Sequence, residues 1–250
     1  MFLCIVVLKN DWNMNRTLKA MLPVMLLVVF AAGCSKPDEP NHGDDPGNEV
    51  DEHEYVDLGL PSGTLWATCN IGADTPEGVG DYFAWGETTP KSVYDWKSYQ
   101  YGNCIDNWYA ITKYCTDSVW GLNGFVDNLT LLEPDDDAAT VNWGDDWRMP
   151  TKEEWEELYQ KTTWTWTDIN GVKGRLLTGS NGNSIFLPAT GFRLDGELIC
   201  LGLGIYWSKT LHDHFPERGW SYHFDFESSH VCGTYERSRG HVVRAVRSAE

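Results

Sequence analysis

Stacking by aromatic side chains is the chemistry that this sequence offers most plainly, since its 250 residues include 13 Trp, 11 Tyr and 9 Phe. Exposed indole and phenol rings can bind the apolar faces of sugar rings while Asp and Asn side chains bind the hydroxyl groups, and no metal is needed. Packing in the core is the alternative role for any such ring. The candidate ligand-binding residues are the aromatics outside any alternating core pattern: Trp96, Trp108, Tyr109, Trp120 and Tyr235.

Histidines and acids form a second chemically versatile group, late in the chain: His212, Asp213, His214, His223, Asp225, Glu227 and His230. These residue types bind zinc, but their spacing is loose and the stretch runs into a loop pattern at 215–219. A solvated polar loop is therefore the preferred interpretation. The acidic run 135–137 indicates the start of a helix, with adventitious cation binding as the alternative. We expect no metal and no cofactor.

Five cysteines lie beyond the first 34 residues: Cys69, Cys104, Cys115, Cys200 and Cys232. An odd number leaves at least one thiol unpaired. The pairs Cys104 with Cys115 and Cys200 with Cys232 have spacings that could close loops, although spacing does not fix the connectivity. Cys69 lies in an apolar stretch and is predicted to be a small buried residue.

Catalysis and nucleic-acid binding are both disfavoured. No glycine-rich phosphate loop, nucleophile motif or paired-carboxylate signature is evident, so we predict no catalytic residue and no enzyme. Lys and Arg total 19 against 37 Asp and Glu, for a net charge of −18. Such a surface repels phosphate backbones and anionic headgroups, which excludes nucleic acid as a partner and leaves lipidation as the route to a membrane.

The N-terminus carries a targeting pattern. Basic residues in 15–19 precede an apolar run over 21–32 and then Gly33-Cys34, which predicts a signal peptide over 1–33, with Met14 as an alternative start. The apolar run rises roughly 18 Å as a helix, short of the roughly 30 Å hydrocarbon core. The ending resembles a bacterial lipobox with Ala31 in place of the usual Leu, so we expect Cys34 to be acylated, with palmitate among the chains.

Residues 34–54 form the predicted tether. The stretch is rich in acids and prolines and has a single aliphatic residue, Val50, so burial cannot offset the entropy of ordering it. Residues 36–39 resemble the acidic export signal of Bacteroidetes lipoproteins, although a solvated linker would look the same. We expect a protein anchored by its lipid in the outer membrane and exposed at the cell surface.

Strands dominate the second half of the sequence. Residues 163–168 alternate Trp with Thr and end at Asn170-Gly171, a tight hairpin signal, and Asn181-Gly182 joins residues 175–178 to 184–187 in the same way. The alternation of Trp220, Tyr222, Phe224 and Phe226 predicts one strand with an aromatic core face. A last strand is expected over 241–247, and residues 88–133 read as long loops with short strands.

Two helices are expected beside these hairpins. Thr151 with Glu154 makes a capping box for a helix over 151–161, and a shorter helix is predicted over 134–142, ended by Gly144. Two helices with antiparallel hairpins and long irregular loops predict an α+β domain over residues 55–250.

Six ordered blocks resemble the Fibrobacter succinogenes major paralogous domain, and the resemblance spans about residues 55–248. The blocks are residues 56–67 (VDLGLPSGTLWA), 81–87 (DYFAWGE), 147–155 (WRMPT with Glu154-Trp155), 187–191 (LPA with Gly191), 206–208 (YWS) and 243–247 (VRAVR). The resemblance implies a C-type-lectin-like fold, distantly related to formylglycine-generating enzymes. It implies no established activity, so function must come from sites.

Two activities of related folds fit poorly. Formylglycine-generating enzymes bind copper(I) through two close thiols, whereas residues 230–247 offer only Cys232. The calcium motif of sugar-binding lectins is not matched by residues 133–135 or by Trp143-Gly144-Asp145. We therefore expect a non-catalytic surface lipoprotein that binds an extracellular glycan or protein. A structural or adhesive envelope module is the alternative, followed by a divergent oxidase.

Overall fold

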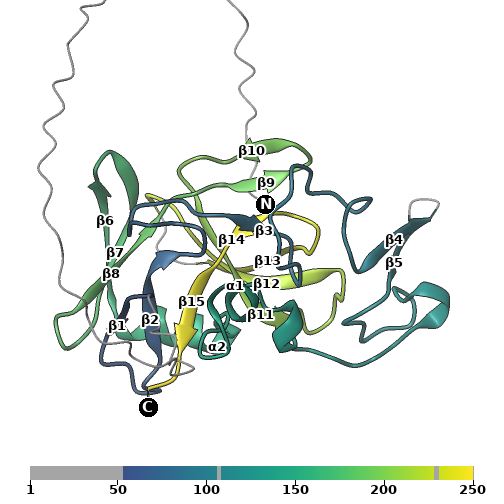
Figure 1. The fold of residues 1–250 in the computed structure, drawn as a ribbon, viewed down its shortest axis with the longest axis horizontal. Coiled ribbons are helices and arrows are strands. Elements are labelled where there is room, and N and C mark those ends of the chain that lie inside the picture. Colours follow the sequence, from purple (N-terminus) through teal and green to yellow (C-terminus); the bar gives the residue numbers. More distant parts are fainter. Residues whose placement is uncertain (1–52, 106–107, 228–230, 250) are drawn as a thin grey trace, which may run out of the picture. The chain divides into compact units, whose positions relative to one another are not determined.

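The computed structural model describes residues 53–105, 108–227 and 231–249. Residues Glu52–Glu250 form one compact unit (Figure 1). The signal peptide, Cys34 and nearly all of the tether lie outside the described residues, so their roles stay predictions. Within the described ranges, no helix is long and apolar enough to cross a membrane.

A five-stranded sheet lies at the centre of the core. Its pairs are antiparallel except for one parallel pair, β11 with β14. Alternation along the strands places Tyr206, Tyr222 and Phe224 in one hydrophobic cluster and Trp207 in a second, so each face of the sheet supports a core of its own. The strand order is β13 (Val231–Glu236), β12 (Arg218–Phe224), β11 (Gly204–Leu211), β14 (His241–Val242) and β3 (Tyr82–Phe83).

The last strand pattern divides between two sheets. The sequence predicts one strand over 241–247, but β14 ends at Val242 and β15 (Arg244–Arg247) pairs with β2 (Leu65–Asn70), which also pairs with β1 (Tyr55–Asp57). Arg244 fixes the point where the chain passes from one sheet to the other. Its fully buried guanidinium donates to the carbonyl oxygens of Ala67 and Thr68 at 3.0 and 2.6 Å. Because these buried donors are satisfied only in this position, Arg244 ends the strand where the hydrophobic pattern alone would extend it.

The predicted hairpins are confirmed. β6 (Thr163–Ile169), β7 (Val172–Thr178) and β8 (Ser184–Pro188) form a three-stranded antiparallel sheet. Asn170 and Gly171 join β6 to β7 with φ of 51° and 86°, the left-handed pair that a tight hairpin turn requires. This sheet and the β4–β5 hairpin lie on opposite sides of the view (Figure 1).

Both predicted helices are present. α2 (Lys152–Lys161) begins with the expected capping box of Thr151 and Glu154. The shorter helical segment is a 3₁₀ turn, η2 (Pro134–Asp136), followed by α1 (Ala138–Trp143), which begins at the cap residue Asp137 rather than at Pro134. The remaining short elements are β4 (Gly102–Ile105), β5 (Trp108–Ile111), η1 (Leu122–Gly124), β9 (Phe192–Leu194) and β10 (Glu197–Ile199). The architecture is therefore α+β with irregular loops, as predicted.

One side-chain prediction is wrong, and one of the two possible disulfides is not formed. Phe226 is 69% exposed, because β12 ends at Phe224 and the alternation stops with the strand. Cys115 is a buried thiol that contacts the Asp117 carbonyl oxygen at 3.1 Å and forms no disulfide, so the pairing with Cys104 is not made. The side chain of Cys232, the other possible partner of Cys200, lies outside the described residues.

Candidate functional site

The aromatic residues proposed from the sequence do not share one environment. Trp96 is 8% exposed and packs in the core, with its ring perpendicular to that of Tyr99 at a centroid distance of 5.3 Å. The prediction that Trp96 binds ligand is therefore wrong. The weak periodicity around Trp96 reflects a loop that folds over the core, held by a turn in which Ser98 N donates to Asp95 Oδ1 at 2.8 Å.

The other four candidates have different outcomes. Tyr235 is half-buried, with the rings of His241 and Phe192 at 4.8 and 5.5 Å, so most of its surface is already packed. Trp120 is also half-buried, and it stays a candidate. Trp108 and Tyr109 are the first two residues of β5, whose backbone the structure describes. Their side chains lie outside the described residues.

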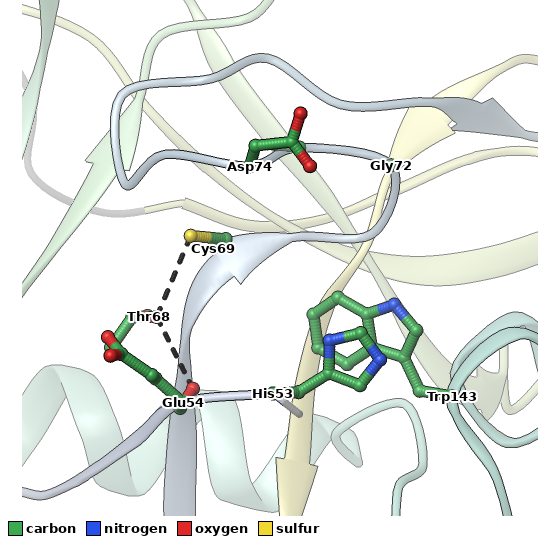
Figure 2. A pocket seen from close by; sticks show the side chains of 8 residues that line it. His53, Glu54, Thr68, Cys69, Gly72, Asp74 and Trp143 are labelled. Atoms are coloured by element: carbon green, nitrogen blue, oxygen red, sulfur yellow. Dashed lines mark hydrogen bonds between the residues drawn. The ribbon is translucent and has the colours of Figure 1, made fainter. Parts of the chain in front are cut away.

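A pocket of about 520 Å³ opens elsewhere, between the start of β1, the end of β2 and the last residue of α1 (Figure 2). Its size suits a small ligand such as one or two sugar rings. Three segments that are distant in the sequence contribute its lining: His53, Glu54, Thr68, Cys69, Gly72, Ala73, Asp74 and Trp143.

The floor of the pocket is set by the pairing of β1 with β2. Thr68 donates twice to the carbonyl oxygen of Glu54, from its backbone N at 3.0 Å and from its hydroxyl at 3.3 Å. After β2 the chain turns at Gly72, which has a φ of +79°, and a Cβ there would lie 2.4 Å from the Asp81 carboxylate. Only glycine fits this turn, which brings Ala73 and Asp74 back over the pocket.

One wall of the pocket is aromatic. The imidazole of His53 lies flat on the indole of Trp143, with ring centroids 4.0 Å apart and planes 15° apart (Figure 2). Trp143 in turn contacts the fully buried Trp147 edge-on at 5.3 Å. The wall is therefore a surface layer of rings supported by a core ring.

Asp137 fixes the helix that carries Trp143. Its buried carboxylate accepts the N–H groups of Ala139 and Thr140, at 3.0 and 3.3 Å, and so caps α1. It also accepts the N–H of Met149 at 2.9 Å and pairs with Lys209 at 3.1 Å. Asp137 thus links the start of α1 to Met149, which lie at the two ends of the segment that contains Trp143 and Trp147.

The opposite side of the pocket is polar. Figure 2 shows Asp74 on the loop after β2, Glu54 at the start of β1 and Cys69 between them in this view. Cys69 is half-buried and forms no disulfide, and its sulfur lies 3.6 Å from the Thr68 hydroxyl. The prediction of a buried Cys69 is therefore wrong, because Cys69 lies one residue before the end of β2 and its side chain is at the edge of the pocket.

The pocket offers stacking, hydrogen bonding and negative charge. In the described part of the chain, no group of three or more His, Cys, Asp or Glu could hold a metal ion.

In the late histidine stretch, His212 Nδ1 accepts the N–H groups of His214 and Phe215, each at 3.1 Å, and the His212 ring stacks on Trp220 at 5.0 Å. His212 is therefore used within its own loop, and His230 lies outside the described residues.

Sequence reasoning missed the pocket for identifiable reasons. His53 and Glu54 fall at the end of an acidic stretch that reads as tether. Trp143 reads as the residue before a helix-ending Gly144 and as part of a triplet that does not match the lectin calcium motif. The available signal was the predicted end of that helix, which places Trp143 at an element boundary where a large ring is less easily buried.

Comparison with models of known protein families, with curated proteins and with solved structures finds no match for this chain.

Proposed function

We propose that this chain is a non-catalytic surface lipoprotein whose compact unit binds an extracellular ligand, of the glycan class, in the pocket beside Trp143. The proposed anchor is an acylated Cys34 in the outer membrane, and the proposed family is the C-type-lectin-like one that the six sequence blocks resemble. The observation that carries the binding proposal is the pocket itself, where a half-exposed ring pair faces polar side chains across about 520 Å³.

The ring pair supports a sugar in particular. The apolar face of a pyranose can pack on the His53–Trp143 stack, while its hydroxyl groups reach Thr68, Glu54 and Asp74 around the rim. Trp147 beneath the stack keeps the wall in place without ligand, which limits the ordering cost of binding. A peptide ligand is the alternative occupant of the same pocket.

Glycan-array screening of the purified chain tests the proposal, followed by calorimetric titration with the best binder. We expect Trp143→Ala to abolish measurable binding and Trp120→Ala to leave it unchanged, since Trp120 is half-exposed but does not line the pocket. Binding that survives Trp143→Ala and is lost with Trp120→Ala would move the site to the loop first predicted from the sequence.

A structural or adhesive role is the second candidate, favoured by one observation. β6 is an edge strand of seven residues, and near its middle Trp166 contacts the exposed ring of Phe226 at 6.0 Å. An open edge beside exposed rings can pair with a strand of another protein. Co-purification of an envelope protein at equal stoichiometry, lost on Thr165→Pro, would support this role over glycan binding.

A further inference from the structure

The pocket is negatively charged on its rim. Its carboxylates, Glu54 and Asp74, are both exposed, and neither forms a side-chain hydrogen bond or an ion pair with any residue that the structure describes. No Lys or Arg occurs among the described residues that line the pocket. Both charges are therefore available to a ligand.

Two arginines that contact residues at or beside the pocket lining have their donors engaged elsewhere. Arg244 lies beneath the floor, fully buried, and its guanidinium donates to Asn70 Oδ1 at 2.9 Å and to three backbone carbonyl oxygens. Arg247 lies over the rings of Tyr55 and Trp147, at 5.1 and 5.5 Å, and pairs with Asp146 at 3.4 Å. Their charges moderate the local potential without providing a site for an anion.

The aromatic wall acts in the same direction as the carboxylates. The face of an indole ring carries negative potential and attracts cations, most strongly where water is partly excluded. A cationic group between the His53–Trp143 stack and the rim would gain from the ring face and from both carboxylates. An anionic group would meet two like charges on a chain whose net charge is already −18.

We propose that the ligand carries a protonated amine, so that the pocket prefers a sugar with a free amino group over the corresponding neutral or acidic sugar. This proposal rests on the proposed function and specifies its ligand class. The amine would lie between Glu54 and Asp74 with the sugar ring against Trp143. Because the two carboxylates are exposed, we expect a preference of about tenfold rather than an absolute requirement.

Three hexoses that differ mainly in charge test the preference: glucosamine, glucose and glucuronate. Calorimetric titration of the purified chain at neutral pH is expected to give the order glucosamine, glucose, glucuronate, with about tenfold between the first two. Raising the NaCl concentration from about 20 to 300 mM should reduce that ratio, since exposed charges are screened. Glucose binding as tightly as glucosamine would overturn the proposal.

Isosteric variants locate the effect. Glu54→Gln with Asp74→Asn should bring the ratio of the affinities for glucosamine and glucose to about one, because the amides keep an oxygen that can accept from the hydroxyl groups of both sugars but lose the charge that attracts the amine. Asp145→Asn is the matched control, because Asp145 is an exposed carboxylate outside the lining, and it should keep the preference. A preference that persists in the double variant would overturn the assignment to Glu54 and Asp74.

Two further outcomes separate this proposal from the proposed function. If none of the three sugars binds, or if Trp143→Ala leaves their binding unchanged, the glycan pocket itself is wrong. Cyclohexylamine, a six-membered ring with an amine and no hydroxyl groups, distinguishes the amine from the sugar. Weaker binding than glucosamine supports an amino sugar, and equal binding overturns the sugar class.

Discussion

Three imidazole rings among the described residues stack on indole rings, and two of these stacks have nearly the same geometry in different surroundings. His53 stacks on Trp143 at 4.0 Å and 15°, at the wall of the pocket, and His241 stacks on Trp207 at 3.8 Å and 20°, in the fully buried second core cluster. The buried pair is covered by further rings, those of Phe192 and Tyr235. The same contact is therefore part of the packed core in one place and part of a pocket wall in the other, and the presence or absence of covering rings makes the difference.

Trp207→Ala should have the largest effect on stability. Trp207 is completely buried and its indole N–H donates to the Phe83 carbonyl oxygen at 2.8 Å. We expect a loss of about 3–5 kcal/mol in the free energy of unfolding, from the cavity and the unpaired carbonyl. Trp143→Ala, measured by the same urea titration, should cost about 1 kcal/mol or less. Equal losses would show that Trp143 is a core residue.

Trp143→Ala should instead remove ligand binding. We expect the affinity for the best glycan binder to fall at least about tenfold, roughly 1.4 kcal/mol, with the folded state retained. Trp143→Phe keeps a ring of smaller area and should recover part of the affinity. A near-native affinity in the Ala variant would contradict the assignment of the pocket wall.

The buried His241 should also make the stability of the fold depend on pH. Burial, assisted by Arg239 and by the imidazole of His223, holds the pKa of His241 well below its ordinary value of 6.5. The folded protein keeps His241 neutral, while the unfolded chain binds a proton below about pH 6.5. This contribution to stability is fully present above that pH and is lost as the pH falls, by roughly 1 kcal/mol for each pH unit.

Urea titrations between pH 5 and 8 measure that slope, with His241→Phe as the comparison. Both ring nitrogens of His241 lack a hydrogen-bond partner among the described residues, so Phe should be tolerated at neutral pH. The difference between the two curves isolates His241, because His212, whose pKa is also lowered by burial, titrates in both proteins. Parallel curves would show that His241 is not the source of the slope.

His53→Ala should have the smallest effect. His53 is half-exposed, so we expect a change of no more than about 0.5 kcal/mol in the free energy of unfolding. The affinity for the glycan should fall a fewfold, because the ligand loses one of the two rings of the wall while Trp143 remains. An unchanged affinity would show that the ligand contacts Trp143 alone.

Local signals in the sequence predicted local structure well. The capping box of Thr151 and Glu154 and the two Asn-Gly turns act over a few residues, and each specifies its element without help from the rest of the chain. The α+β class followed from those elements. The sequence pattern did not predict where the last strand ends, because Arg244 and its buried carbonyl partners divide that stretch between two sheets.

The pocket could not be predicted in the same way. It forms where residues 53–54, 68–74 and 143 meet, and nothing within any one segment indicates the other two. Composition drew attention to aromatic rings, but whether a given ring is buried depends on what covers it. Trp96 is covered by its own loop, whereas Trp143 is left at the surface by the end of α1.

The division of the last strand also has a consequence for synthesis. β15 completes the sheet that β1 and β2 begin, and β14 lies between β11 and β3, so residues 241–247 fill places in two sheets at once. Neither sheet can close while the ribosome still holds these residues. Both sheets therefore close only after most of the compact unit has been synthesised, because they pair strands from opposite ends of it, and pairing across such long sequence separations is slow.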